Sequence, residues 1–255
     1  MNLLGVIFNV TALLVGGFVY WRFAERSQSS YLRLAAASGL IAGALTARLA
    51  EYLAEGIPFS LLLHPEYGGR TILGGVIGGW VGVELAKRWL GIRAPTGDAF
   101  GLALAAAEVF GRIGCYFNGC CFGKVSTMPW AIYQHGEWRH PTQLYSGAAA
   151  ALIFAILLWA RSRVARGQLF ALYLMLFAGG RLVIEPFRDD FGIGAAAYVA
   201  EAASAALLVA GAVVWWRRSV VAAVGGRASS GCVIERSRRV RPHPGSVSDG
   251  ATDPG

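Results

Sequence analysis

Charged side chains are scarce in this sequence, at 15% of the residues, whereas hydrophobic residues make up 55%. This composition leaves too few polar side chains to cover the surface of a water-facing globule. The formal net charge is +8, but Lys and Arg lie between apolar runs and not along one stripe, which argues against a nucleic-acid partner. We therefore expect a membrane protein that binds no nucleic acid.

A basic start followed by a small-residue cleavage site is also missing. The first five residues contain no Lys or Arg, and the apolar run that follows ends in aromatic residues and Arg22. We expect no removable signal peptide. Cysteine is rare too: of the four, Cys115, Cys120 and Cys121 lie close together, which excludes a domain held by several disulfides.

Long apolar runs are abundant. A hydrocarbon core about 30 Å thick needs roughly 20 apolar residues per helix. Runs of about this length occur at residues 3–21, 34–53, 71–87, 98–117, 142–160, 168–186 and 195–216. They predict an all-α, polytopic transmembrane bundle of about seven spans within residues 1–218. Residues 219–255 are rich in Ser, Gly, Pro and Arg, which predicts a disordered basic cytoplasmic tail.

The distribution of Lys and Arg between the loops predicts the orientation of the bundle. One set of alternate loops, with the tail, carries sixteen of these residues and the other set carries four. Cytoplasmic loops hold the excess, so the N-terminus is predicted outside and the C-terminus in the cytoplasm. Three further arginines, Arg48, Arg112 and Arg181, lie within apolar runs, at a similar predicted depth near the outer face.

An arginine inside the bilayer costs at least about 2.5–3.5 kcal/mol, so each needs compensation. Glu51, Glu108 and Glu185 lie three or four residues from the three arginines, and ion pairs within each helix are one interpretation. Arg48 could instead extend to the nearby interface. The shared depth favours a third interpretation, in which the guanidinium groups hold a phosphate such as a phospholipid head group.

Glycine recurs along the third apolar run. The residues are Gly74, Gly75, Gly78, Gly79 and Gly82. Pairs four apart line one helical face and predict close packing against a neighbouring helix. The outer end of this helix could also present backbone N–H groups to an anion.

Three segments, Gly111–Gly123, Arg139–Tyr145 and Gly180–Arg188, resemble in order and spacing the motifs of the prolipoprotein diacylglyceryl transferase family. The resemblance implies a bacterial inner-membrane enzyme without a cofactor. Such an enzyme moves the diacylglyceryl group of phosphatidylglycerol onto the lipobox cysteine thiol in the signal peptide of a prolipoprotein, and glycerol phosphate leaves. A diverged relative with another acceptor and a non-catalytic membrane protein that binds phospholipid or a partner remain alternatives. A solute transporter is disfavoured, because the charges cluster at one face.

The resemblance also implies roles for individual residues. The catalytic candidates are Arg112, Arg181, His140 and Glu185, and the phospholipid-binding candidates are Arg112, Asn118, Gly123, Gln143, Tyr145, Arg181 and Arg188. Arginines suit the negative charge that develops on a leaving phosphate, whereas the attacking thiol has to be deprotonated.

The base for that deprotonation is open, because Leu73, Cys115 and Cys120 stand where the family pattern has His, Asn and Glu. His140 is a candidate base with an alternative structural role in its loop. Glu108 is another candidate, with an ion pair to Arg112 as its alternative.

The cysteines allow several interpretations. With His135 and His140 they could form a zinc or redox site, in an oxidising compartment they could form a disulfide, and as small apolar side chains they could simply pack. Their spacing matches no strong zinc template, and adjacent cysteines rarely ligate one ion. We therefore expect no metal site.

Overall fold

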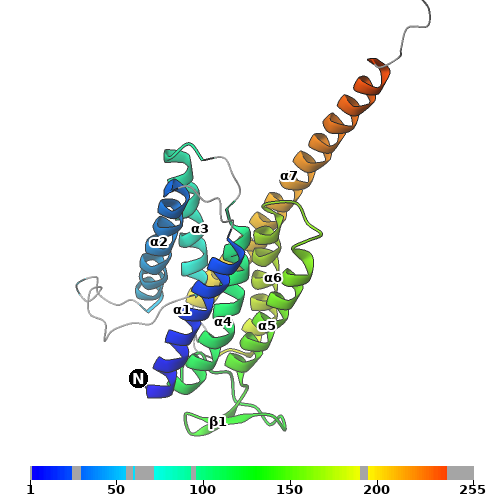
Figure 1. Cartoon of the computed structure of the whole chain (residues 1–255). Helices are drawn as coiled ribbons and strands as arrows, with labels where there is room; N and C mark the ends of the chain where they lie inside the picture. The colour runs from blue at the N-terminus through cyan, green and yellow to red at the C-terminus, as the bar shows by residue number, and fades with distance from the viewer. Residues whose placement is uncertain are drawn as a thin grey trace, which may run out of the picture. The chain divides into compact units, whose positions relative to one another are not determined.

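Helices dominate the computed structural model, which describes residues 2–24, 30–55, 60, 72–92, 96–189 and 195–239. In chain order the helices are α1 (Leu3–Phe23), α2 (Ser30–Glu55), α3 (Ile72–Trp89), α4 (Asp98–Asn118), α5 (Thr142–Ala160), α6 (Gln168–Ile184) and α7 (Ala195–Arg239). A 3-10 turn, η2 (Glu185–Phe187), follows α6, and strands β1 (Ile132–Gln134) and β2 (Glu137–Arg139) form an antiparallel hairpin between α4 and α5 (Figure 1). Each predicted apolar run coincides with a helix, which confirms the all-α membrane bundle.

Five of these helices contain a stretch long and apolar enough to cross a membrane, namely α1, α4, α5, α6 with η2, and residues Tyr198–Ala222 of α7. The apolar part of α2 is shorter, Leu34–Ala50. The last turns of α3 carry Glu84, Lys87 and Arg88, which reduce its apolar length. Two of the seven predicted spans are therefore less apolar than a typical transmembrane helix.

The chain divides into two units, residues 1–218 and 219–255. In the second unit, α7 continues as a helix to Arg239, where the sequence composition predicted disorder. Proline is absent between these limits and first returns at Pro242, so nothing forces the helix to end earlier. Residues 240–255 lie outside the described part of the chain, and the cytoplasmic placement of the tail stays a prediction.

The glycines of α3 pack against α2, as predicted. A Cβ atom on Gly78 would lie 1.7 Å from the Thr46 hydroxyl oxygen, and one on Gly82 would lie 2.5 Å from the Cβ atom of Ala42. The Thr46 hydroxyl also donates a hydrogen bond to the Gly74 carbonyl at 2.9 Å. The two helix backbones can approach closely because these positions lack side chains.

Helices α4, α5 and α6 form the core beside the site. Leu102, Ala105, Leu157 and Leu174 are each at most 2% exposed. At the far end of this core, the Asp98 carboxylate accepts hydrogen bonds from the backbone N–H groups of Gly167 and Phe170, at 2.7 and 3.1 Å. These bonds satisfy donors at the start of α6 and fix it against α4.

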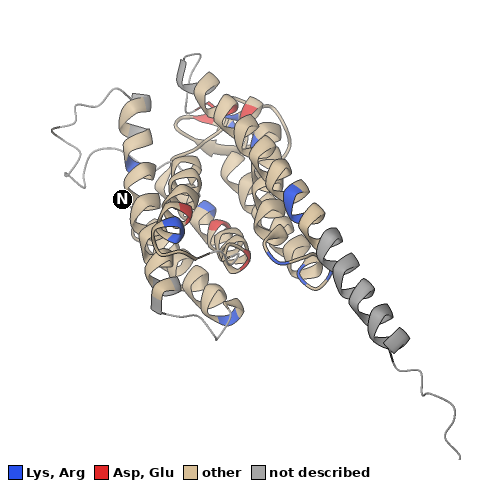
Figure 2. Cartoon of the chain, turned by 90° about the horizontal axis from the view of Figure 1, so that it is seen from above, with Lys and Arg blue, Asp and Glu red and all other residues tan. Residues whose placement is uncertain are grey.

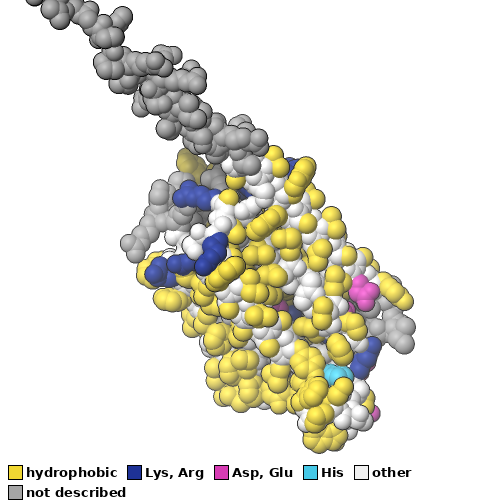
Figure 3. All heavy atoms as spheres, turned by 90° about the vertical axis from the view of Figure 1, so that its right-hand side faces the viewer, with side chains coloured by type: hydrophobic (Ala, Val, Ile, Leu, Met, Phe, Trp, Pro, Cys, Tyr) yellow, Lys and Arg dark blue, Asp and Glu magenta, His cyan; other side chains and the backbone are white. Residues whose placement is uncertain are grey.

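The outer surface of the bundle is hydrophobic. Leu13, Leu152 and Val183 are 76%, 63% and 70% exposed, and few charged residues interrupt the described helices (Figure 2). On the face in Figure 3, hydrophobic side chains cover the middle, and most of the visible Lys and Arg side chains gather at its upper end. Such a surface suits lipid surroundings. The orientation of the bundle in the membrane stays a prediction.

Candidate functional site

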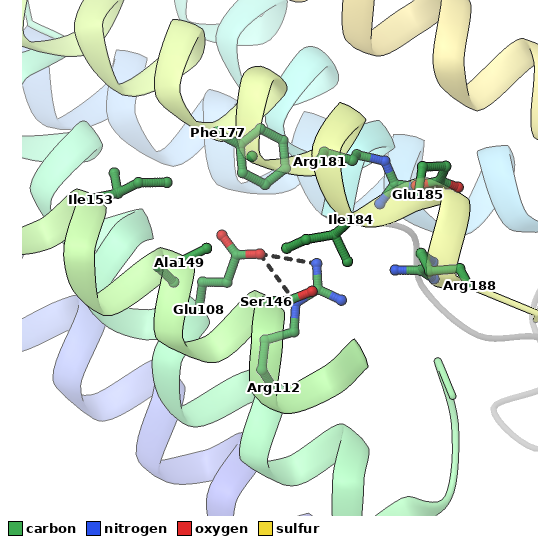
Figure 4. Close-up of a pocket in the computed structure, with 12 residues that line it drawn as sticks. Glu108, Arg112, Ser146, Ala149, Ile153, Phe177, Arg181, Ile184, Glu185 and Arg188 are labelled. Atoms are coloured by element: carbon green, nitrogen blue, oxygen red, sulfur yellow. Dashed lines mark hydrogen bonds and ion pairs between the residues drawn. The ribbon is translucent and has the colours of Figure 1, made fainter. Parts of the chain in front are cut away.

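Charged side chains converge on a pocket between α4, α5, α6 and the turn after α6 (Figure 4). Its polar lining consists of Glu108, Arg112, Ser146, Arg181, Glu185 and Arg188. Apolar side chains of α5 and α6, including Ile153, Phe177 and Ile184, complete it. Three arginines against two glutamates give the lining one excess positive charge, which suits an anion.

Ion pairs within the helices hold two of the arginines. The Nε and one terminal nitrogen of Arg112 donate to Glu108 Oε1 at 3.1 and 2.9 Å, and both side chains are buried. One terminal nitrogen of Arg181 lies 3.3 Å from a carboxylate oxygen of Glu185. Both predicted pairs are therefore present, and the two arginines also share one pocket. Ion pairing and a common site are compatible here.

Backbone pairing between two loops brings Arg188 to the same pocket. The Lys124 N–H donates to the Phe187 carbonyl at 2.9 Å, and Gly123 forms an antiparallel bridge with Arg188. A Cβ atom on Gly123 would lie 2.5 Å from the His140 carbonyl oxygen and 2.8 Å from that of Phe187. Glycine is required at this position because two backbone segments approach it from different sides.

The loop after α4 turns sharply and is fixed by α5. Gly119 ends α4 in the left-handed conformation, with φ of 69°. The Gln143 side-chain amide donates to the Cys120 carbonyl at 2.9 Å, and the Thr142 hydroxyl donates to the Cys121 carbonyl at 2.8 Å. Thr142 and Gln143 are each 1% exposed. Gln143 therefore supports the loop instead of lining the pocket.

His140 and Tyr145 lie beside the hairpin. The His140 ring nitrogen Nδ1 is 3.2 Å from the Tyr145 hydroxyl, which accepts a hydrogen bond from the Trp130 indole N–H at 2.7 Å. The His140 backbone accepts from Gly123 and donates to Lys124, and its ring packs against Phe187. This geometry supports the structural role considered for His140. Neither His140 nor Tyr145 is among the pocket-lining residues.

Asn118 and Arg48 lie away from the pocket. Asn118 packs on α1, since a Cβ atom on Gly5 would overlap its side-chain amide. Its Oδ1 is buried and has no hydrogen-bond partner among the described residues. Arg48 stacks over the Tyr52 ring at 5.6 Å and does not line the pocket. The expectation that all three membrane arginines meet is wrong for Arg48, because equal depth does not fix which way a helix faces. The Glu51 side chain lies outside the described part of the chain.

The sulfur atoms of Cys115, Cys120 and Cys121 cluster at the end of α4 and in the loop after it, one helical turn beyond Arg112, which lines the pocket. All three are free thiols, and their sulfurs lie within 4.8 Å of one another. Hydrogen bonds from the Cys115 and Cys120 thiols, aided by the charges of Arg188 and Arg112, lower the pKa of Cys121 far below its usual value. The hydrogen bonds with Cys115 and Cys121, together with burial, raise the pKa of Cys120.

The sequence of this chain also matches known proteins. A sequence model described as prolipoprotein diacylglyceryl transferase matches residues 3–217. The chain belongs to the prolipoprotein diacylglyceryl transferase family. Within this family it resembles the phosphatidylglycerol-prolipoprotein diacylglyceryl transferase of Clostridium tetani, with 32% identity over 168 residues, which are 60% of this chain and 66% of that protein.

Two further transferases of the same description share more identity over shorter stretches. That of Frankia alni is 40% identical over 134 residues, 48% of this chain and 36% of the relative. That of Wolinella succinogenes is 42% identical over 94 residues, 36% of this chain and 35% of the relative. The similarity to these prolipoprotein diacylglyceryl transferases therefore spans between 35% and 66% of their own length.

Some residues of the site gave no signal in the sequence. Gln134 accepts a hydrogen bond from Gln143 at 3.1 Å, and Asp189 pairs with Arg139 at 2.5 Å. Both contacts depend on the β1–β2 hairpin, which the hydrophobic pattern did not predict. Strands of three residues are too short to produce a recognisable alternation.

Proposed function

We propose that this chain transfers the diacylglyceryl group of phosphatidylglycerol to the lipobox cysteine thiol of a prolipoprotein signal peptide, in the bacterial inner membrane. The observation that carries the proposal is the convergence of Arg112, Arg181 and Arg188 on one pocket in a bundle with a lipid-facing surface. Family membership supports it. The N-terminus lies outside and the C-terminus in the cytoplasm, so the pocket opens near the outer leaflet.

The phosphate of the lipid binds to the three arginines. Each guanidinium offers several coplanar N–H donors, and two-point contact with phosphate oxygens fixes the lipid in one orientation. Glu108 and Glu185 hold Arg112 and Arg181 in place before the lipid enters, because each pair spans one helical turn. Pre-positioned charge lowers the barrier more than charge that has to rearrange.

Transfer requires the acceptor thiolate to attack the glycerol carbon that carries the phosphate. A bond forms between sulfur and carbon, and the carbon–oxygen bond breaks with its electron pair passing to glycerol phosphate. The arginines stabilise the negative charge that appears on this leaving group. Ile153, Phe177 and Ile184, on the apolar side of the pocket, contact the diacylglycerol portion and keep water from the reacting carbon.

The test uses bacteria depleted of their own transferase and supplied with this chain and a lipobox substrate. Wild-type protein is expected to restore diacylglyceryl attachment, measured as the mass of the substrate. Arg112→Ala and Arg181→Ala are expected to lower the rate by about 100-fold or more, which corresponds to one lost charge contact in the transition state.

Arg163→Ala is the matched control, because Arg163 contacts the Trp159 carbonyl at the opposite end of α5 and does not line the pocket. It is expected to retain wild-type lipidation at equal protein level. Failure of the wild type to lipidate any substrate, with normal membrane insertion, contradicts the transferase. Binding of phosphatidylglycerol without transfer would then favour a phospholipid-binding relative.

A further inference from the structure

We propose that the sulfur atoms of Cys115, Cys120 and Cys121 bind one zinc ion beside the arginine pocket, with the fourth coordination position open to the acceptor thiol. The zinc site itself depends only on the cysteine cluster. Its role toward the acceptor rests on the proposed function. The spacing of the cysteines in the sequence predicts no metal site, but the folded loop brings their three sulfur atoms together.

The geometry of the three sulfurs suits a thiophilic ion. They lie within 4.8 Å of one another, and all three are free. Tetrahedral zinc with zinc–sulfur bonds of about 2.3 Å requires sulfur–sulfur distances of about 3.8 Å. The sulfurs therefore have to approach one another by at most about 1 Å to reach this value. Adjacent cysteines within a helix point in different directions and cannot bring their sulfurs together in this way. Here the turn at Gly119 and the left-handed Cys121, with φ of 60°, fold the loop back toward Cys115.

The loop that carries two of the ligands is held in place before any ion binds. The Cys120 N–H donates to the Cys115 carbonyl at 3.2 Å. The buried side chains of Gln143 and Thr142 hold the Cys120 and Cys121 carbonyls. A site whose ligands sit on fixed backbone loses little conformational entropy when it binds a metal.

The charge surroundings also fit. Three thiolates and one Zn²⁺ carry a net charge of about −1, which the bundle has to compensate. Arg112 lies three residues before Cys115 on α4, and Arg188 pairs with Gly123, two residues after Cys121. The arginines that attract a phosphate therefore also compensate the negative charge of a zinc–thiolate site.

The open position explains how the acceptor thiol loses its proton. Among the described residues that line the pocket there is no histidine, and Glu108 and Glu185 are each paired with an arginine. Zinc with three protein ligands keeps one position for substrate, and a thiol that coordinates it becomes a thiolate. The thiol proton passes to water at the loop, the sulfur then attacks the glycerol carbon, and the departing glycerol phosphate takes up a proton from water.

The test measures metal in the full chain, purified in detergent under reducing conditions without added lipid or acceptor. We expect about one zinc per chain by mass spectrometry. Replacing zinc with Co²⁺ is expected to produce a sulfur-to-cobalt charge-transfer absorption, a readout on the wild type that does not depend on any variant folding. Cys120→Ser and Cys121→Ser are expected to bind zinc at least about tenfold more weakly.

Cys232→Ser is the matched control, because it removes the fourth cysteine of the chain, which lies in the other unit, and is expected to leave zinc content unchanged. Three results would each overturn the zinc site. The wild type could contain no zinc, the Cys120→Ser, Cys121→Ser double variant could retain zinc, or freshly isolated protein could contain a disulfide among the three cysteines. A chain that lipidates equally well without zinc overturns its role. A chain that binds zinc but transfers no lipid contradicts the proposed function and leaves the metal site supported.

Discussion

Gly123→Ala tests whether the pairing of two loops positions the arginine pocket. The added methyl group would lie 2.5 Å from the His140 carbonyl oxygen, 2.7 Å from its Cβ atom and 2.8 Å from the Phe187 carbonyl oxygen. Two of these three atoms belong to the backbone and cannot rotate away, so the segments have to separate. The bonds from Gly123 N–H to His140 and from Lys124 N–H to Phe187, at 3.1 and 2.9 Å, are then lost.

Two backbone hydrogen bonds at roughly 0.5–1.5 kcal/mol each give an expected stability loss of about 1–3 kcal/mol. Separation also moves Arg188, which follows Phe187 directly, so we expect lipidation to fall by about tenfold or more, as for a misplaced contact in an active site. Unfolding in detergent and the rate of lipidation at equal protein level measure the two effects. Gly17→Ala is the control, because a Cβ atom on Gly17 meets nothing within 4 Å. A Gly123→Ala protein with wild-type stability and activity would refute the reasoning.

Three further substitutions test other parts of the structure. Glu108→Gln leaves the buried Arg112 charge uncompensated and is expected to cost about 3–5 kcal/mol in unfolding experiments, whereas Glu137→Gln, in a partly exposed pair, is expected to cost at most about 1 kcal/mol. Gly78→Val is expected to separate α2 from α3 and lower the unfolding temperature, and an unchanged temperature would contradict the close packing at this site. Tyr145→Phe removes the hydroxyl that accepts from Trp130 and is expected to cost about 1 kcal/mol and to accelerate hydrogen exchange in the hairpin, where unchanged exchange would argue against this contact.

The helices could be predicted from the sequence because each one is a long, continuous run of apolar residues. A run of about twenty apolar residues has few alternatives to a helix in lipid. The hairpin gave no such signal, because its two strands contain three residues each. The structure continues α7 to Arg239, whereas composition predicts disorder from residue 219, because composition alone does not show whether a polar segment without proline forms a helix.

The site was predicted in part. Arg112 and Arg181 share a pocket because their helices both face α5, whereas Arg48 lies at a similar predicted depth but contacts Tyr52. Depth follows from sequence position, but the direction of a side chain follows from helix packing, which the apolar pattern did not resolve. The sequence showed that the three cysteines are close in the chain, but their spacing argued against a metal site. Their arrangement in space depends on the left-handed conformations at Gly119 and Cys121, which the sequence pattern did not predict.

The most direct test of the central claim uses the purified chain in vesicles that contain phosphatidylglycerol and a synthetic lipobox peptide. Mass spectrometry of the peptide is expected to show the added diacylglyceryl group, with release of an equal amount of glycerol phosphate. The rate at which both products form is expected to fall by about 100-fold or more with Arg112→Ala or Arg181→Ala and to stay at the wild-type level with Arg163→Ala. A peptide that gains no mass with the wild-type chain, or gains it equally with all three variants, contradicts the assignment of the arginine pocket.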